Sequence, residues 1–231
     1  AVVAAIMQQK LIEEDTAQKR DGSPSKKPEK NSLRLLREMS PALRRLLVAD
    51  ILVRFCEQIP YAFVIVWSMK IIQAPVTALQ FGILTSIEMA TAMLIYIPVA
   101  YFADRSAKKP FVVATFVFFT LFPLSLIFAR SFEILVLAFI LRGLKEFGEP
   151  TRKALIMDLA PENRKAAMFG LYYMMRDIIV SLAAFGGAFL WLISPQVNLL
   201  VAFAFGVIGT LSFALSGHSF GEGDSGMRNT E

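Results

Sequence analysis

Residues 197–216 read VNLLVAFAFGVIGTLSFALS and contain no charged side chain. A helix of about 20 apolar residues is long enough to cross the ~30 Å hydrocarbon core of a bilayer. Five further apolar blocks come before it, at residues 46–69, 78–103, 111–129, 132–147 and 166–193. Backbone groups in lipid must be hydrogen-bonded within their own segment, so we expect each block to be a helix. The sequence therefore predicts an all-α integral membrane protein with six transmembrane helices.

The composition supports a membrane protein and argues against several kinds of site. Hydrophobic residues make up 55% of the chain and charged residues 19%, against roughly 45–50% and 25% in a soluble domain. The single cysteine, Cys56, and the single histidine, His218, cannot build a disulfide framework or a zinc site. We therefore expect no metal, no cofactor and no catalytic residue. The net charge of +5 comes from short basic clusters between the blocks, which does not indicate nucleic-acid binding.

The polar and apolar stretches divide the chain into four predicted parts. Residues 1–7 are apolar but too short to span, and we interpret them as the end of a preceding transmembrane helix. Residues 8–45 are polar and predict a cytoplasmic linker, whose last part, 32–45, has the pattern of an amphipathic helix lying on the bilayer surface. Residues 46–216 form the six-helix membrane domain, and residues 217–231 predict a disordered cytoplasmic tail.

The loop charges predict the orientation of the chain. Basic residues come before the first block, between the second and third, and between the fourth and fifth. With six crossings these three regions fall on one side, and the positive-inside rule makes that side cytoplasmic. We therefore expect both ends of the six-helix unit to be cytoplasmic, in a plasma (bacterial inner) membrane.

Several charged residues lie inside the apolar blocks, where each costs several kcal/mol and so marks a candidate site. The candidates for a substrate or proton pathway are Arg54, Glu57, Glu88, Arg176 and Asp177. Arg54 and Glu57 are spaced i, i+3 and can pair on one helix face. Arg176 and Asp177 are adjacent, point about 100° apart and need not pair. Structural pairing between helices is the alternative to a transport role.

The loop between the second and third blocks, residues 100–110, reads AYFADRSAKKP. It resembles the cytoplasmic loop signature of the major facilitator superfamily: Gly, three residues, Asp-Arg, any residue, Gly, and two basic residues. The charged positions match at Asp104, Arg105, Lys108 and Lys109, whereas alanine stands at both glycine positions. Residues 142–170, RGLKEFGEPTRKALIMDLAPENRKAAMFG, look like the end of the superfamily's fourth helix and the loop that follows it. The resemblance covers residues 46–216.

This resemblance implies a twelve-helix transporter of two six-helix halves joined by a long cytoplasmic linker. The chain would be the C-terminal half, and the other half of the same transporter would be its partner, together with the lipid bilayer. A first half with a long N-terminal extension is the alternative. The implied function is secondary active transport of a small solute by alternating access, with proton coupling an open question, and no enzymatic activity. A transporter-like scaffold or sensor, or a membrane-embedded lipid enzyme, are the competing hypotheses.

The resemblance also implies a conformational role for the loop. In such loops the acid pairs with nearby basic groups or a helix N-terminus and holds one closed state, which would assign this role to Asp104 with Arg142 and Arg152 as candidate partners. The alternative is that the loop charges only fix the topology. The predicted gating set is Asp104, Arg105, Lys108, Lys109, Arg142 and Arg152.

Overall fold

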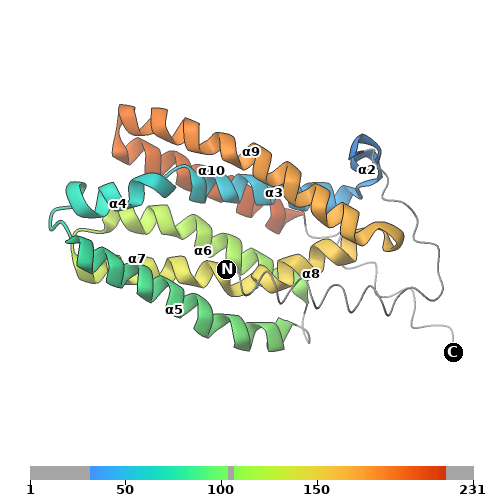
Figure 1. Ribbon diagram of the computed structural model, residues 1–231, viewed down its shortest axis with the longest axis horizontal. Coiled ribbons are helices and arrows are strands. Elements are labelled where there is room, and N and C mark those ends of the chain that lie inside the picture. The colour runs from blue at the N-terminus through green and yellow to red at the C-terminus, as the bar shows by residue number, and fades with distance from the viewer. Residues whose placement is uncertain (1–31, 104–106, 217–231) are drawn as a thin grey trace, which may run out of the picture. The chain divides into compact units, whose positions relative to one another are not determined.

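The computed structural model describes residues 32–103 and 107–216, and these residues contain helices and no strand (Figure 1). The helices are α2 (Ser32–Glu38), α3 (Pro41–Gln58), η1 (Tyr61–Phe63), α4 (Val64–Val66), η2 (Trp67–Ile71), α5 (Ala78–Ala103), α6 (Lys108–Phe128), α7 (Phe132–Leu144), η3 (Lys145–Gly148), α8 (Glu149–Leu159), η4 (Glu162–Arg164), α9 (Lys165–Ile193) and α10 (Pro195–Leu215). The predicted all-α fold is confirmed. The predicted helix end at 1–7, most of the linker at 8–45 and the tail at 217–231 lie outside the described residues.

Four of the described helices are long and apolar enough to cross a membrane: Ala78–Tyr96 of α5, all of α6, the stretch Glu162–Ile193 that ends with α9, and α10. The other two predicted blocks are built in pieces. The first is α3 followed by η1, α4 and η2, and the fourth is α7 followed by η3. In Figure 1 these pieces run alongside the continuous helices, α3 against α10 and α7 against α6.

The interruption of the first segment has an identifiable physical cause. Proline at position 60 cannot donate a backbone hydrogen bond, and α3 ends at Gln58 just before it. At the other end α3 begins at Pro41, where the Ser40 hydroxyl accepts a hydrogen bond of 3.2 Å from the Leu43 amide. The first helix therefore starts five residues before the predicted boundary at residue 46.

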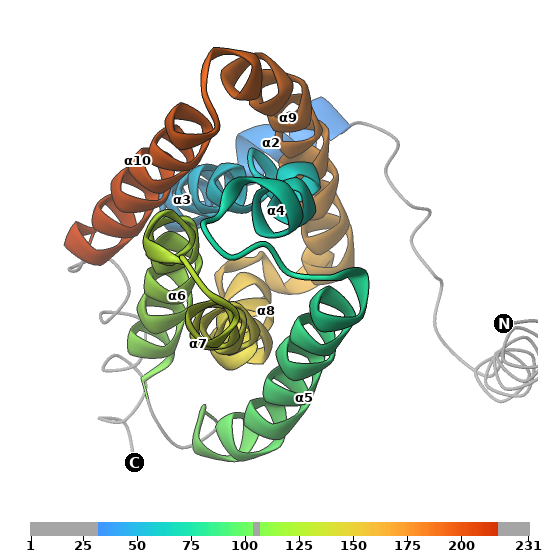
Figure 2. The same ribbon diagram turned by 90° about the vertical axis from the view of Figure 1, so that its left-hand side faces the viewer.

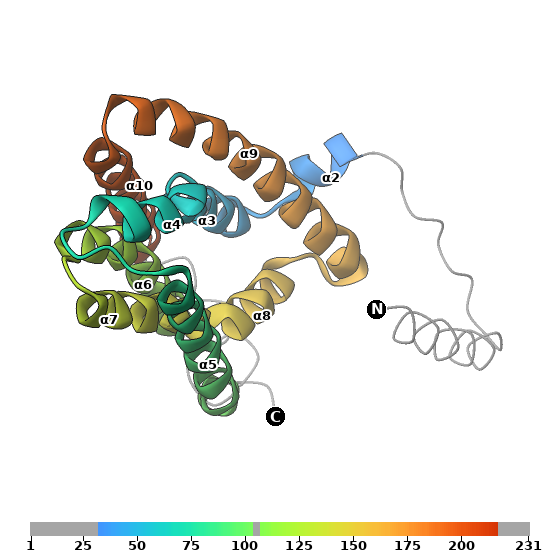
Figure 3. The ribbon, with the colours of Figure 1, turned by 60° about the vertical axis from the view of Figure 1, so that its left-hand side comes forward.

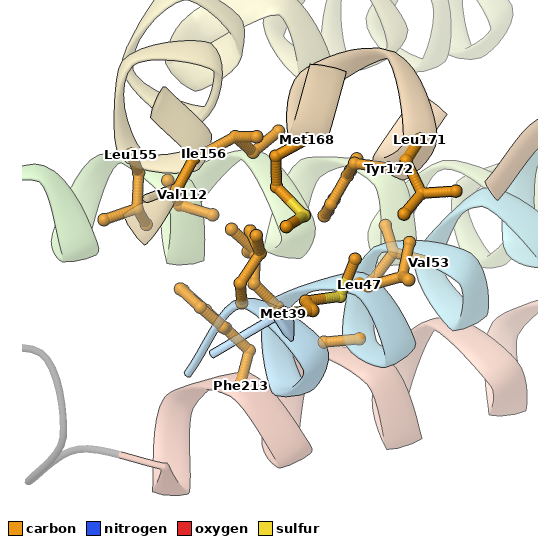
Figure 4. Close-up of a cluster of buried hydrophobic side chains, with 14 of the residues drawn as sticks. Met39, Leu47, Val53, Val112, Leu155, Ile156, Met168, Leu171, Tyr172 and Phe213 are labelled. Carbon is orange, nitrogen blue, oxygen red and sulfur yellow. The ribbon is translucent and has the colours of Figure 1, made fainter. Parts of the chain in front are cut away.

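The prediction that residues 32–45 form one continuous helix is wrong, whereas a position on the bilayer surface stays a prediction. The helix breaks before Pro41, and the buried side chains of Leu35 in α2 and of Met39 just after it belong to a protein core. Figure 4 shows Met39 beside Leu47 of α3 and Phe213 of α10 in this cluster. The apolar face of a short helix can be covered by lipid or by protein, and here α8, α9 and α10 supply the cover.

Two polar contacts hold α2 and the turn after it against the end of α8 and the start of α9. Arg164 forms an ion pair of 2.7 Å with Glu38, and the Ser40 hydroxyl donates to the Leu159 carbonyl at 3.2 Å. The end of the predicted linker is thus a packed part of the bundle.

Small residues allow close helix contacts, as expected for association in lipid. A side chain at Gly187 of α9 would collide with the Ile59 carbonyl, and Asn198 donates to the Gly187 carbonyl at 2.8 Å. At Gly209 of α10 an added Cβ would lie 2.9 Å from the Ala49 carbonyl of α3. In α9, Gly187 therefore permits a close helix contact, whereas Gly186 faces open space.

The helices α5 and α9 leave most of their apolar residues exposed, whereas α6 and α10 bury more of theirs. The two helices lie apart in Figure 2, and Figure 3 shows α8 leading from the α5 side to the start of α9. The bundle thus presents two apolar helices that require lipid or protein cover.

Candidate functional site

A network of ion pairs starts on one face of α3. Asp50, Arg54 and Glu57 are spaced by four and three residues, which places all three on the same side of the helix. The Arg54 guanidinium lies 3.0 Å from Glu57 and 3.8 Å from Asp50. The predicted Arg54–Glu57 pair is confirmed.

On one side the network reaches α8 and α9. Arg152 is buried, forms an ion pair with Asp50, and donates to both carboxylate oxygens of Glu149 at 2.6 and 2.7 Å. The Tyr172 hydroxyl donates to Asp50 at 3.0 Å, and Arg54 donates to Glu149 at 3.3 Å. Buried charges are tolerated when they are paired, and each charged group here has a partner of opposite sign. The Nε atoms of Arg54 and Arg152 are buried without a hydrogen-bond partner among the described residues.

Glu149 is the first residue of α8, just beyond the fourth apolar block. Burial alone would raise the pKa of Glu149, but the neighbouring Arg152 and Arg54 outweigh it and lower the pKa from 4.5 to about 2. Glu149 therefore stays ionised at physiological pH and does not act as a proton carrier while these contacts last.

A second group of charges joins α3, α5, α7 and η3. The Lys145 ammonium lies 2.6 Å from Glu57 and 3.5 Å from Glu88, and Arg142 lies 3.2 Å from Glu88. Glu88 is only 3% exposed. No charged residue in its own helix pairs with it, so the partners come from the neighbouring segment. The aromatic ring of Phe122 lies 5.1 Å from the Arg142 guanidinium, a cation–π distance.

Arg176 and Asp177 do pair, at 2.7 Å, although adjacent helix positions point in different directions. The long arginine side chain reaches around the helix to its neighbour. Arg176 also lies 3.6 Å from Asp50, which joins α9 to the network. The Asp177 side chain is 62% exposed and lies at the edge of the network.

The predicted gating loop is only partly described. Asp104 and Arg105 lie outside the described residues, so their contacts remain a prediction. Lys108 at the start of α6 pairs with Asp158 of α8, and the Lys109 ammonium donates to a backbone carbonyl of α10 at 3.0 Å.

The two arginines predicted to receive Asp104 have carboxylate partners in the structure. Arg142 pairs with Glu88, and Arg152 pairs with Asp50 and Glu149. The described residues therefore place Arg142 and Arg152 in the network.

Two cavities lie beside this network and share Glu88, Met89 and Lys145. The first, of about 590 Å³, lies between α5 and η3, and its lining includes Met93, Tyr96 and Glu146. The second, of about 450 Å³, has a lining that includes Tyr61, Phe81, Thr85 and Arg142. Both volumes fall in the range of small-molecule sites, which bind apolar groups and a few polar ones.

Four members of this site were not among the predicted site residues: Asp50, Lys145, Glu146 and Glu149. Their spacing carried a partial signal, since Asp50 comes four residues before Arg54 and Glu149 three residues before Arg152. Which faces of α3 and α8 meet depends on how the helices are rotated and packed.

The sequence matches the family profile described as Major Facilitator Superfamily over residues 46–218. None of the curated proteins matches it closely enough to be reported as a relative. The matched region includes all the apolar helices and every charge of the network, and it covers well over half of the chain. The chain therefore belongs to the Major Facilitator Superfamily, a family of membrane transporters.

Proposed function

We propose that the chain is the C-terminal six-helix half of a secondary transporter that moves a small solute by alternating access. The observation that carries this proposal is the charged group on α3, α5, α7 and η3 beside two cavities. Apolar side chains would hold helices together at lower cost than buried ion pairs. Charges next to an open volume at membrane depth are therefore best explained by a pathway for a polar or charged solute.

The partner in this proposal is the other six-helix half of the same transporter. The exposed apolar residues of α5 and α9 support it, because two helices with long uncovered faces suit packing against a second bundle as well as lipid. The loop charges support cytoplasmic positions for both ends of the unit, in a plasma membrane.

Proton coupling would act through the shared Lys145. Glu57 and Glu88 both contact this single ammonium, and Glu88 also holds Arg142. A proton on Glu88 would remove its charge and release Arg142, while Lys145 would stay with Glu57. The protonation state would thereby change the contact between α5 and α7, which is a two-state element of the kind that transporters need.

The loop residues Asp104 and Arg105 would stabilise one closed state from the cytoplasmic side. The Lys108–Asp158 pair supports this role, because it joins the start of α6 to α8 directly after the loop. Rocking of the two halves would have to break such contacts.

Flux measurements on the full-length protein test the proposal. Proteoliposomes with an internal pH dye would be exposed to a panel of sugars, amino acids, carboxylates and amines, with and without an imposed pH gradient. We expect saturable flux for at least one class, and a loss of its pH dependence in Glu88→Gln. Asp177→Asn tests the other pathway candidate, and Glu162→Gln, at an exposed site outside the network, is the control. A folded protein that moves none of the panel would favour the scaffold or sensor hypothesis.

A further inference from the structure

We propose that the cavity between α5 and η3 binds an organic cation with an apolar body, and that Glu146 is its charge partner. This inference rests on the proposed transport function and names the class of solute. The cavity measures about 590 Å³, and its lining includes the side chains of Glu88, Lys145 and Glu146.

Three charged side chains line the cavity, and they differ in whether they already have an ion-pair partner. Lys145 is shared by Glu57 and Glu88, and Glu88 is further held by Arg142. Glu146 forms no ion pair with any group in residues 32–103 or 107–216. The lining therefore offers one carboxylate without a direct partner, while its ammonium is already neutralised by two carboxylates.

The ion pairs at the cavity favour one sign of the ligand charge. An anion would have to displace Glu57 or Glu88 from Lys145 and leave a carboxylate without its cation, which is unfavourable in a partly desolvated site. A cation needs to displace nothing, because it gains Glu146 as a new partner. Charge complementarity thus favours a positively charged ligand.

The uncharged lining of the cavity indicates what the rest of the ligand is like. Apart from the three charged groups, the cavity is lined by Met89, Ala92, Met93, Gly143 and Tyr96. Methionine side chains adapt to irregular apolar shapes, and an aromatic ring attracts a cation over its face. This lining has few groups that could hydrogen-bond a sugar or another highly hydroxylated solute. An apolar body with one positive charge fits it best.

Two ions of the same shape and opposite charge test the proposal. Tetraphenylphosphonium and tetraphenylborate would be titrated by equilibrium dialysis against the full-length protein in nanodiscs, with empty nanodiscs as the control for partition into lipid. We expect the cation to bind at least tenfold more tightly than the anion. Glu146→Gln should weaken cation binding by roughly tenfold, the effect of losing one charge-assisted contact, and should leave anion binding unchanged. Glu162→Gln, at an exposed site away from the cavity, is the matched control.

The outcomes separate this inference from the proposed function. Equal binding of both ions, or unchanged cation binding in Glu146→Gln, would overturn the cation assignment even if the protein transports another solute. Cation binding without any solute flux would support the site and contradict transport. If Glu146→Gln does not fold, Met93→Trp provides the second test, because a larger side chain should fill the cavity and weaken cation binding. Full affinity in that variant would also overturn the proposal.

Discussion

Replacing Asp50 with Asn should destabilise the protein strongly without changing its volume. Asp50 is 1% exposed and accepts contacts from Arg152, Arg54, Arg176 and Tyr172. Among the described residues, the substitution removes the one negative charge that all these groups share. Arg152 is itself buried, so it would keep a positive charge in a low-dielectric interior with Glu149 as its remaining partner.

The structure sets the size of the expected effect. Removing one member of a buried ion pair costs about 3–5 kcal/mol, and the remaining Glu149 contact places Asp50→Asn near the lower end. A loss of about 3 kcal/mol changes the unfolding equilibrium by roughly 100-fold. In a domain of this size it corresponds to a fall in melting temperature of about 6–12 °C.

The assay is thermal unfolding in detergent micelles, followed by intrinsic fluorescence, for a cycle of variants. Asp50→Asn and Arg152→Met would be measured alone and together, with Glu162→Gln as the exposed control. We expect the double variant to be more stable than the sum of the two single effects predicts, because each removes the partner that the other leaves unpaired. Purely additive effects, or a melting temperature of Asp50→Asn within 2 °C of the unchanged protein, would refute the reasoning.

Three further predictions follow from the same contacts. Met39→Asp should release α2 from the core at a cost of about 2–4 kcal/mol, because Met39 is 2% exposed. The release of α2 would be measured as faster tryptic cleavage near Arg37. An unchanged cleavage rate would show that α2 is not held by this contact. The pKa of Glu149 is lowered from 4.5 to about 2, so its ion pairs stabilise the fold above pH 4.5 and this contribution is lost only as pH falls toward 2. The difference in stability between the unchanged protein and Glu149→Gln should therefore be constant from pH 8 to pH 5 and shrink only in stronger acid. A decrease of this difference between pH 7 and pH 5 would mean that the carboxylate titrates there. Glu88→Gln should raise the mobility of Arg142 and weaken the packing of α5 on α7, measured as faster amide hydrogen exchange in α5, and unchanged exchange would show that these ion pairs do not hold the helix.

The fold was predictable from the sequence because the lipid environment imposes a strong length rule. The six apolar blocks follow from the length needed to cross a bilayer. The Arg54–Glu57 pair follows from the i, i+3 spacing within one helix. The interruptions of the helices in the first and fourth blocks were harder to predict, because the charged and proline residues of these blocks lie in stretches that are still apolar on average. The packing of α2 against the protein core was not predicted, since an amphipathic pattern does not distinguish a lipid surface from a protein surface.

The candidate site was predictable only in part. Glu88 and Arg176 were recognised as costly charges at membrane depth, but the partners of Glu88 and the Asp50 that contacts Arg176 come from other segments. The Asp50–Arg152 pair joins residues 102 positions apart and depends on the rotation of α3 and α8 about their axes. The position of Glu146 in a cavity next to a fully paired Lys145 becomes visible only when the helices are packed.

Alternating access to the cavity between α5 and η3 is the central claim, and thiol labelling of Met93→Cys tests it most directly. The native Cys56 is buried and hydrogen-bonded to the Phe119 carbonyl, so it gives little background labelling. Membrane-impermeant reagents would be applied to the full-length protein from one side of the membrane at a time, at pH 5.5 and pH 7.5. We expect labelling from both sides of the membrane. When the pH changes, the labelling rate from one side should rise as the rate from the other side falls. Labelling from only one side under every condition would contradict it.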